Sequence, residues 1–291
     1  MFQRQRTGSV VCPSCGKLVG VNEKKCYNCG RPAPGMFGFS GLLRALGEDF
    51  GFTGFVTWAC VLFYIASLAK DPSGLGGGGS LLRLLAPTGQ ALFAFGAAGS
   101  LPVYEYGRWW SVLSAGWLHG SLLHIFFNLM WVRQLGALTN HFYGPGRTAI
   151  IYVVACATGF LCTSSVSHFL PFLGWPFGGA RLTVGASAPL FGLLGALVYY
   201  GRRGGGGAQL NQQIKTWAVV LFLFGFVMEG VDNWAHLGGF VGGYLSAHLL
   251  NPLRPERPDH LLIGLVLLLA SIAPILFTLV RFLLSLVGVN V

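Results

Sequence analysis

Long runs without a charged residue dominate the pattern of hydrophobic and polar positions along this chain. Seven of these runs predict helices: Phe50–Ala69, Trp109–Val132, Thr148–Ala180, Leu182–Gly201, Thr216–Met228, Asn233–Leu253 and Leu261–Val280. A helix that crosses a bilayer needs about 20 mostly apolar residues, with a range of about 17–25. Six of the seven runs reach that length, and the fifth does so only by adding Ile214 and Lys215. The pattern therefore predicts seven membrane spans, and it lacks the alternating polarity of a β-barrel.

The predicted spans divide the chain into four parts. The expected helices are roughly Phe52–Ala69, Ser114–Leu138, Arg147–Leu170, a helix from Ser187, Ile214–Gly230, a helix from Trp234, and Leu261–Val280. We expect an all-α polytopic membrane protein, with six spans in residues 51–253 and a seventh, accessory helix in residues 254–291. Residues 1–35 form a separate small module, and residues 36–50 form a linker.

Composition agrees with a membrane protein, and the distribution of charge adds an orientation. Hydrophobic residues make up 53% of the chain and charged residues 10%, whereas soluble domains carry about 25% charged residues. The formal net charge is +10, but many basic residues fall in alternate loops on the side of the basic N-terminus, as the positive-inside rule requires. We therefore expect the lipid bilayer as partner and no nucleic acid. The N-terminus is expected in the cytoplasm, and the location is expected to be the bacterial cytoplasmic (inner) membrane.

The N-terminal module contains two CxxC pairs separated by ten residues, Cys12-Pro-Ser-Cys15 and Cys26-Tyr-Asn-Cys29. Four thiolates suit a tetrahedral, structural Zn²⁺ site. Disulfides are disfavoured in a cytoplasmic segment, and a mononuclear iron centre stays open by ligand type. Because about 30 residues cannot bury much core, the metal is expected to supply the folding energy. The module resembles a zinc ribbon, and the sequence does not identify its cytoplasmic partner.

Polar side chains inside the apolar runs are the candidate chemical groups. His124 and Asn128 are four residues apart and share one face of the second span. Ser187 lies where the fourth span begins, because Pro189 fits only the first turn of a helix. The backbone N–H groups around Ser187 are then left free, at the positive end of the helix dipole. His236 lies in the sixth span, and ionisable groups at such depth are functional candidates.

Small residues predict how two of these helices pack. His236, Gly239 and Gly243 lie on one stripe of the sixth span, while Ser187 and Phe191 lie on one stripe of the fourth. Small residues allow close approach of membrane helices, so the two stripes would bring His236 against Ser187. The serine would be the nucleophile and the histidine its base. Phe191 could hold the imidazole by stacking, and the central part of each span lacks a carboxylate that would complete a triad.

At these residues the chain resembles a rhomboid intramembrane serine protease. The resemblance extends from Phe52 to about Leu250 and rests on four elements: Trp109-Trp110, His119-x4-His124-x3-Asn128, Gly185-Ala186-Ser187, and Ala235-His236-Leu237-Gly238-Gly239. It implies a six-span core that hydrolyses peptide bonds in or near transmembrane segments of single-pass membrane-protein substrates. Ser187 and His236 would form the catalytic dyad, without a catalytic cofactor. The Ser187 N–H, His124 and Asn128 would stabilise the oxyanion, and Gly185, Phe191 and Gly239 would support the site.

Two departures from the family pattern keep alternatives open. The motif GxSG ends here in Ala188, and the Trp-Arg pair of the first loop reads Trp110-Ser111. Arg108 is nearby, but the sequence does not assign it the missing role. A catalytically inactive rhomboid-like protein that binds transmembrane helices is the first alternative. A channel or transporter with a histidine relay ranks last, because the chain shows no inverted halves.

Overall fold

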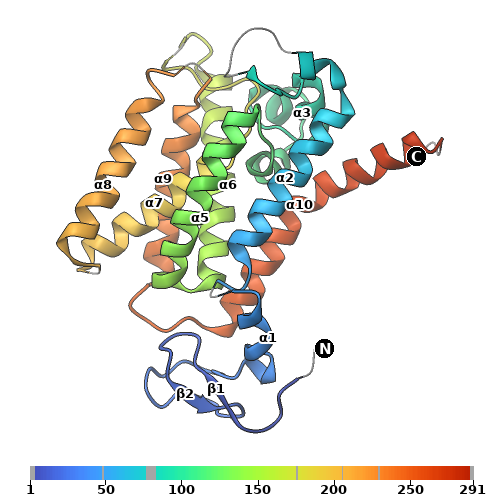
Figure 1. Ribbon diagram of the computed structural model, residues 1–291. Coiled ribbons are helices and arrows are strands. Elements are labelled where there is room, and N and C mark those ends of the chain that lie inside the picture. Colours follow the sequence, from blue (N-terminus) through green and yellow to red (C-terminus); the bar gives the residue numbers. More distant parts are fainter. Residues whose placement is uncertain are drawn as a thin grey trace.

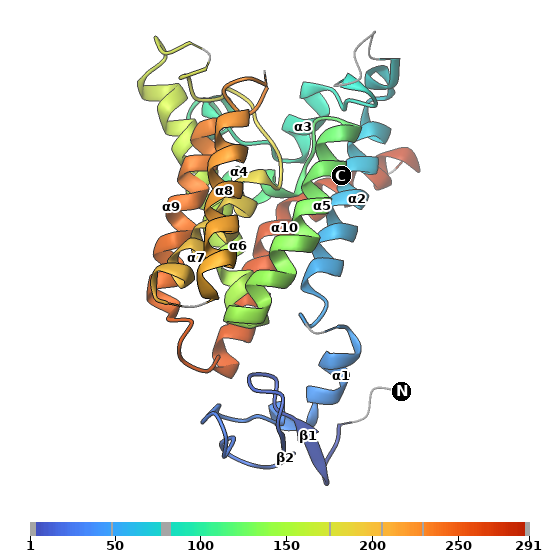
Figure 2. The same cartoon turned by 60° about the vertical axis from the view of Figure 1, so that its left-hand side comes forward.

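The computed structural model of the protein describes residues 4–47, 49–76, 83–174, 176–204, 206–228 and 230–288. Within these residues the chain forms a bundle of helices, with a small two-stranded module beyond one end of the bundle (Figure 1). Two views of the molecule agree that this module lies at the end where α6 and α10 begin (Figure 2).

The N-terminal module is built on one β-hairpin. Strand β1 (Ser9–Val11) pairs antiparallel with β2 (Leu18–Gly20), and Val10 lies opposite Val19. These two valines are buried with Val21 and two of the cysteines in a small cluster of their own. The segment predicted as a linker contains a 3-10 turn, η1 (Met36–Gly38), and a short helix, α1 (Ser40–Ala45), which leads to the bundle.

A long helix occurs in each region where a span was predicted. The helices are α2 (Phe52–Lys70), α5 (Leu122–Tyr143), α6 (Pro145–Phe169), α7 (Ser187–Arg202), α8 (Gly207–Phe224), α9 (Asn233–Leu250) and α10 (Pro258–Leu286). Among the described residues, α2, α6 and α10 are long and apolar enough to cross a membrane. A fourth span is reached if Ser111–Trp117 and Leu122–Tyr143, which are bent by 93° at the break between them, are taken together.

The predicted second span is therefore wrong as a continuous helix from Ser114 to Leu138. The chain forms α4 (Ser111–Ser114) and a 3-10 turn, η5 (Ala115–Trp117), and then breaks before α5. The break ends at Ser121, whose side chain accepts a hydrogen bond from the His124 backbone N–H (3.3 Å) and so caps the new helix. His119 lies in this break instead of in a helix.

Helix α7 begins at Ser187, as the position of Pro189 predicted, and runs through the centre of the bundle. Its residues from Ala188 to Leu197 are all buried, so protein covers it on all sides. It has 16 residues, fewer than a lipid-exposed span requires. A helix enclosed by other helices can be shorter, since its ends are satisfied by protein.

Backbone contacts hold α7 against α9. A methyl group on Gly239 would overlap the carbonyl of Ala188, and a methyl group on Gly243 would overlap the carbonyl of Gly192. Gly195 faces Phe240 of α9 in the same way. The absence of side chains at these positions lets the two backbones touch, the arrangement that small residues permit in membrane bundles.

The connection between α2 and α4 is structured where it is described. It holds a 3-10 turn, η2 (Pro72–Gly76), the helix α3 (Gly89–Phe95) and a π-helical turn, η4 (Leu101–Glu105). Ala98 and Thr183 exchange two backbone hydrogen bonds (3.0 and 2.8 Å). This bridge ties the first loop to the segment that enters α7, and so fixes the backbone just before Ser187.

Helix α10 packs beside α6 and then leaves the bundle. Gly264 of α10 lies against Gly146 and Ala149 of α6, and Ser271 accepts a hydrogen bond from the Trp117 indole N–H (3.1 Å). Its last turns project away from the other helices (Figure 1). The accessory helix thus covers the first loop and the early turns of α6.

Candidate active site and metal centre

The start of α7 presents Ser187 in a tightly held backbone. Gly185 has a φ of +135°, a conformation that is costly for residues with a Cβ. Its N–H donates to the carbonyl of Ala115 (3.0 Å), and the N–H of Ala186 points to Nε2 of His119 (3.5 Å). The N–H of Ser187 has no acceptor among the described residues. A free donor therefore lies beside the Ser187 hydroxyl, at the positive end of α7.

His236 lies one turn into α9 and stacks on Phe191. The two ring centroids are 4.1 Å apart and the planes differ by 14°. Phe191 is one helical turn beyond Ser187, so the imidazole lies over the first turns of α7. His236 is buried, and its Nδ1 has no hydrogen-bond partner among the described residues. The nearest carboxylate in the sequence, that of Asp232, instead caps α9 by accepting from the N–H of Ala235 (3.0 Å).

The structure brings His236 and Ser187 onto facing helices but does not join them by a hydrogen bond. Neither side chain makes a bond to the other among the described residues. Catalytic hydrogen bonds are often long or poorly aligned before a substrate binds, so this spacing does not exclude a dyad. The geometry that is in place is the stacking on Phe191 and the backbone contact between Ala188 and Gly239.

His124 faces the same space from α5. The N–H of Gly120 donates to its Nδ1 (3.3 Å), so Nε2 is the nitrogen left to carry a proton. A Cβ on Gly185 would lie 2.7 Å from this Nε2 and 3.7 Å from the Ser187 hydroxyl oxygen. The missing side chain of Gly185 thus leaves open a space that both groups reach.

Asn128 is buried one turn further along α5. Its Nδ2 donates to the carbonyl of His124 in its own helix (2.8 Å). An amide nitrogen carries two protons, and this bond uses one of them. The predicted partner of His124 is therefore on the correct face of α5, with one donor committed to the backbone.

Sequence reasoning left His119 between a structural and a chemical role. The structure buries this residue completely, places its Nε2 at the Ala186 N–H, and sets its ring 5.2 Å from that of His124. His119 thus contacts both the backbone before Ser187 and the histidine opposite it. The helix break that brings it there depends on the cap at Ser121.

The two departures from the family pattern have clear surroundings. Ala188 is fully buried and fits because its neighbour in α6 is Gly159. The Arg108 guanidinium lies 4.5 Å from the Trp110 ring centroid and donates to the carbonyls of Phe93 (2.7 Å) and Ala94 (3.3 Å). Arg108 therefore binds the C-terminal end of α3. The buried hydroxyl of Ser111 has no partner among the described residues.

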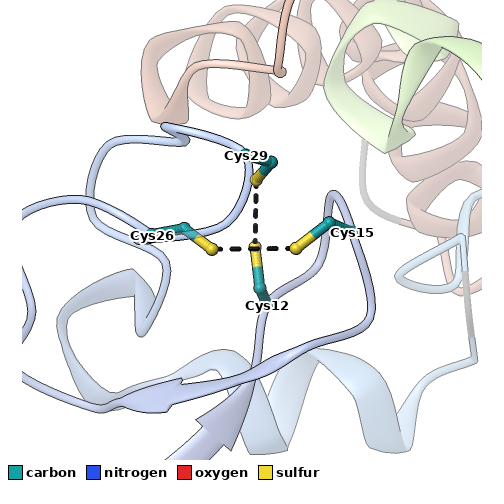
Figure 3. Close-up of side chains that lie close together, drawn as sticks. All are labelled: Cys12, Cys15, Cys26 and Cys29. Atoms are coloured by element: carbon teal, nitrogen blue, oxygen red, sulfur yellow. Dashed lines mark hydrogen bonds between the residues drawn. The ribbon is translucent and has the colours of Figure 1, made fainter.

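The four cysteines of the module form one cluster that could hold a metal ion. Their sulfur atoms all lie within 4.8 Å of one another. The Cys12 and Cys29 sulfurs are 3.8 Å apart and the Cys15 and Cys26 sulfurs 3.7 Å (Figure 3). Tetrahedral coordination with metal–sulfur bonds of about 2.3 Å gives sulfur–sulfur separations of roughly 3.8 Å. The spacing therefore fits a four-coordinate ion without rearrangement.

Backbone donors prepare the module for thiolate ligands. A backbone N–H from Cys29 lowers the pKa of the Cys26 thiol to about 7. Thiolate is the form that binds a metal, so the fold favours the ligand state of Cys26. Each cysteine pair is followed by a glycine with positive φ, Gly16 and Gly30, which lets the chain turn around the sulfurs.

The module contacts the membrane core through a buried ion pair. Arg31, two residues after Cys29, lies 3.5 Å from the carboxylate of Glu256, in the loop between α9 and α10. The same carboxylate accepts from the backbone N–H of Arg147 at the start of α6 (2.9 Å). Burial raises the pKa of Glu256, and the Arg147 backbone N–H opposes that shift. Sequence reasoning missed this contact, since no local pattern links positions so far apart.

These observations define a polytopic helical membrane protein with a polar centre inside its bundle and a cysteine module at one end. A family model for the rhomboid domain matches residues 106–252, which is about half of the 291 residues. The chain belongs to the rhomboid family.

Characterised and named relatives include proteases and an inactive form. The chain is 31% identical over 185 residues to "Rhomboid protease GluP" of Bacillus subtilis, covering 62% of this chain and 34% of that protein. It is 30% identical over 188 residues to "RHOMBOID-like protein 5" of Arabidopsis thaliana, covering 60% and 53%. "Inactive RHOMBOID-like protein 8" of the same plant is 27% identical over 207 residues, covering 68% and 52%. The chain therefore spans between about a third and about half of the length of these relatives.

Proposed function

We propose that this protein is an intramembrane serine endopeptidase that cleaves peptide bonds in or near transmembrane segments of single-pass membrane proteins. The observation that carries the proposal is the stacking of His236 on Phe191, one turn beyond Ser187 (4.1 Å between ring centroids). A histidine held over the first turns of a helix that begins with serine is suited to act as the base for that serine. Membership of the rhomboid family supports the same reaction.

The proposed reaction uses Ser187 as nucleophile and His236 as base. The Ser187 oxygen attacks the carbonyl carbon of the scissile bond while His236 takes the hydroxyl proton. As the tetrahedral intermediate collapses, the C–N bond breaks and His236 gives that proton to the leaving amine. Water, deprotonated by His236, then hydrolyses the acyl ester and restores the serine. No carboxylate is assigned a role, since Asp232 caps α9.

The oxyanion is proposed to form in the space beside Gly185. Its donors are the N–H of Ser187, the protonated Nε2 of His124 and the second amide proton of Asn128. Each preorganised donor is expected to lower the barrier by about 2.7–4 kcal/mol. Gly185 has no side chain to block this space, and the Ala98–Thr183 bridge fixes the strand that leads to it.

The decisive experiment is cleavage of a model single-pass substrate in lipid vesicles by the wild type and by Ser187→Ala. We expect two defined fragments with the wild type and uncleaved substrate with the variant. A fluorophosphonate probe should label the wild type and not Ser187→Ala. Cleavage that survives Ser187→Ala would remove the serine from the mechanism.

A second candidate is a catalytically inactive rhomboid that binds transmembrane helices. Two observations favour it: the likeness to "Inactive RHOMBOID-like protein 8", and the lack of a hydrogen bond between Ser187 and His236 among the described residues. The retained serine and histidine favour the protease. A folded protein that binds a transmembrane peptide but takes no fluorophosphonate label would establish the binding function.

The metal of the module is proposed to be Zn²⁺, with a purely structural role. A site closed by four thiolates leaves no open position for substrate. We also propose that the module and the N-terminus lie in the cytoplasm and that the host membrane is a bacterial inner membrane, because basic residues concentrate on that side. Metal analysis of the purified protein and protease accessibility in sealed vesicles test these two assignments separately.

A further inference from the structure

A second feature of the core has no part in the proposed reaction: a cavity of about 930 Å³ at the end of the bundle opposite the cysteine module. It opens between the last residue of α2, the loop that follows η4, and the second half of α10. Its lining includes three basic residues, Lys70, Arg108 and Arg281, and three aromatic ones, Trp110, Phe277 and Phe282. None of the lining residues is acidic.

The gathering of positive charge is unusual for this end of the molecule. Arg181, at the same end, is paired with Glu105 (3.3 Å). Asp71 follows Lys70 in the chain, but its carboxylate accepts from the hydroxyls of Ser73 and Thr88 and lines a different cavity. The cavity thus concentrates three cations without a lining carboxylate to balance them, a composition that favours an anionic ligand.

Aromatic rings hold the cations at the walls of the cavity. The Lys70 amine lies 5.0 Å from the Phe282 ring centroid, and the Arg281 guanidinium lies 5.9 Å from that of Phe277. Arg108 stacks between Trp110 and Phe93, at 4.5 and 4.6 Å. Such contacts orient a cation while leaving its charge in place. Lys70 and Arg281 come from different helices, so the site exists only because α10 packs beside the first loop.

The cavity also meets the surface of the bundle that faces lipid. Phe277, Val280 and Leu283 of α10 are exposed around it, and such residues contact acyl chains in a bilayer. A ligand that fills this place needs a phosphate or other anionic group for the cations and an apolar part for the helix surface. Free phosphate satisfies only the first requirement.

The geometry points to a binding site for an anionic phospholipid, with the phosphodiester headgroup between Lys70, Arg108 and Arg281 and an acyl chain along α10. The accessory helix then has a function of its own: it supplies one wall and one cation of a lipid site. The assignment does not depend on proteolysis, because none of these residues belongs to the site around Ser187.

The test compares wild type with the double variant Lys70→Gln, Arg281→Gln. Both positions are exposed, so folding should survive, whereas Arg108 is left intact because it binds the end of α3. Purified protein is titrated with fluorescent phosphatidylglycerol in micelles, and with phosphatidylcholine and inorganic phosphate as separate competitors. Each cation removed should weaken binding by about fivefold, which gives roughly 25-fold for the pair.

The matched control is Arg83→Gln. Arg83 is an exposed basic residue in the same loop region that does not line the cavity. We expect it to bind phosphatidylglycerol as the wild type does, with phosphatidylcholine and inorganic phosphate competing weakly. Equal loss in Arg83→Gln, or unchanged binding in the double variant, would overturn the site. Full competition by inorganic phosphate would overturn the assignment to a lipid.

Discussion

The Arg31 guanidinium and the Glu256 carboxylate form a buried pair, 3.5 Å apart, with 1% and 2% of their side chains exposed. Arg31 belongs to the cysteine module and Glu256 to the loop before α10, so this pair joins the two parts of the protein. The backbone carbonyl of Arg31 accepts from the N–H of Cys26 (2.8 Å). The position of the guanidinium is therefore set by the cysteine turn, and docking depends on a folded module.

Substitution of Arg31 should release the module and destabilise the protein. Arg31→Met leaves Glu256 buried with only the Arg147 backbone N–H as donor, and an unpaired buried charge is costly. In a double-mutant cycle with Glu256→Gln, we expect a coupling free energy of about 1–3 kcal/mol. Denaturant unfolding in micelles gives the free energies, and limited proteolysis reports release of the module.

An exposed pair provides the control for this cycle. Arg257 and Asp259 are 2.8 Å apart, but their side chains are 65% and 43% exposed. Solvent-exposed pairs contribute about 0–1 kcal/mol, so Arg257→Met should change stability little and leave the module docked. Similar coupling in the two cycles would show that the Arg31 pair does not hold the module.

Metal removal should unfold the module and leave the membrane core helical. The module's own buried cluster is small, so metal binding is expected to supply its folding energy. After chelation we expect rapid proteolysis before residue 50, with little change in helical circular dichroism. Lower pH should also release the metal, because thiols must lose their protons to bind it. Loss of the helical signal on chelation would mean that the core needs the module to fold.

Asn128→Ala should slow turnover more than it weakens substrate binding. If Asn128 donates to the oxyanion, its loss removes a contact made in the transition state, and kcat should fall by about 10²–10³ with KM nearly unchanged. Thr139→Ala, at another buried position of α5, is the control and should keep kcat close to the wild-type value. An equal effect of Asn128→Ala on kcat and KM would exclude it from the oxyanion site.

Loss of the Phe191 ring should disturb the base without removing it. An aromatic pair contributes about 0.5–1.5 kcal/mol beyond its buried area, so Phe191→Leu should lower kcat up to roughly tenfold. Because Phe191 would act through His236, the pH dependence of kcat should move as well. Phe191→Tyr keeps the stacked ring and should restore both. A kcat loss without a shift of the pH profile would indicate general loosening of α7.

Local rules predicted most helices because they depend on neighbouring residues. Pro189 fixed the start of α7, since proline fits only a first turn, and apolar length located α2 and α6. The break before α5 was missed because an uncharged run does not reveal that Ser121 caps a new helix. The Arg31–Glu256 pair was missed for a different reason: its members are 225 residues apart, and only the folded chain brings them together.

The candidate site divides in the same way. His124, Asn128, Ser187 and His236 stood out because polar groups are rare in apolar runs. What the sequence could not provide is their mutual placement, which depends on glycine contacts between α7 and α9 and on the Ala98–Thr183 bridge. The role of His119 likewise follows from the helix break and not from its spacing to His124.

Gly239→Ala tests the backbone contact that places α9 against α7. The added methyl group would overlap the carbonyl of Ala188, so the helices must separate, and overpacking of this kind costs about 1–3 kcal/mol. The matched control is Gly54→Ala in α2, where no heavy atom of the described residues lies within 4 Å of the new methyl group. That change should stabilise the protein by roughly 0.5–1 kcal/mol through helix propensity. Thermal unfolding in micelles distinguishes them, since the two variants should shift the midpoint in opposite directions. If Gly239→Ala were as stable as the wild type, α7 and α9 would not pack backbone to backbone, and His236 would lose its support beside Ser187.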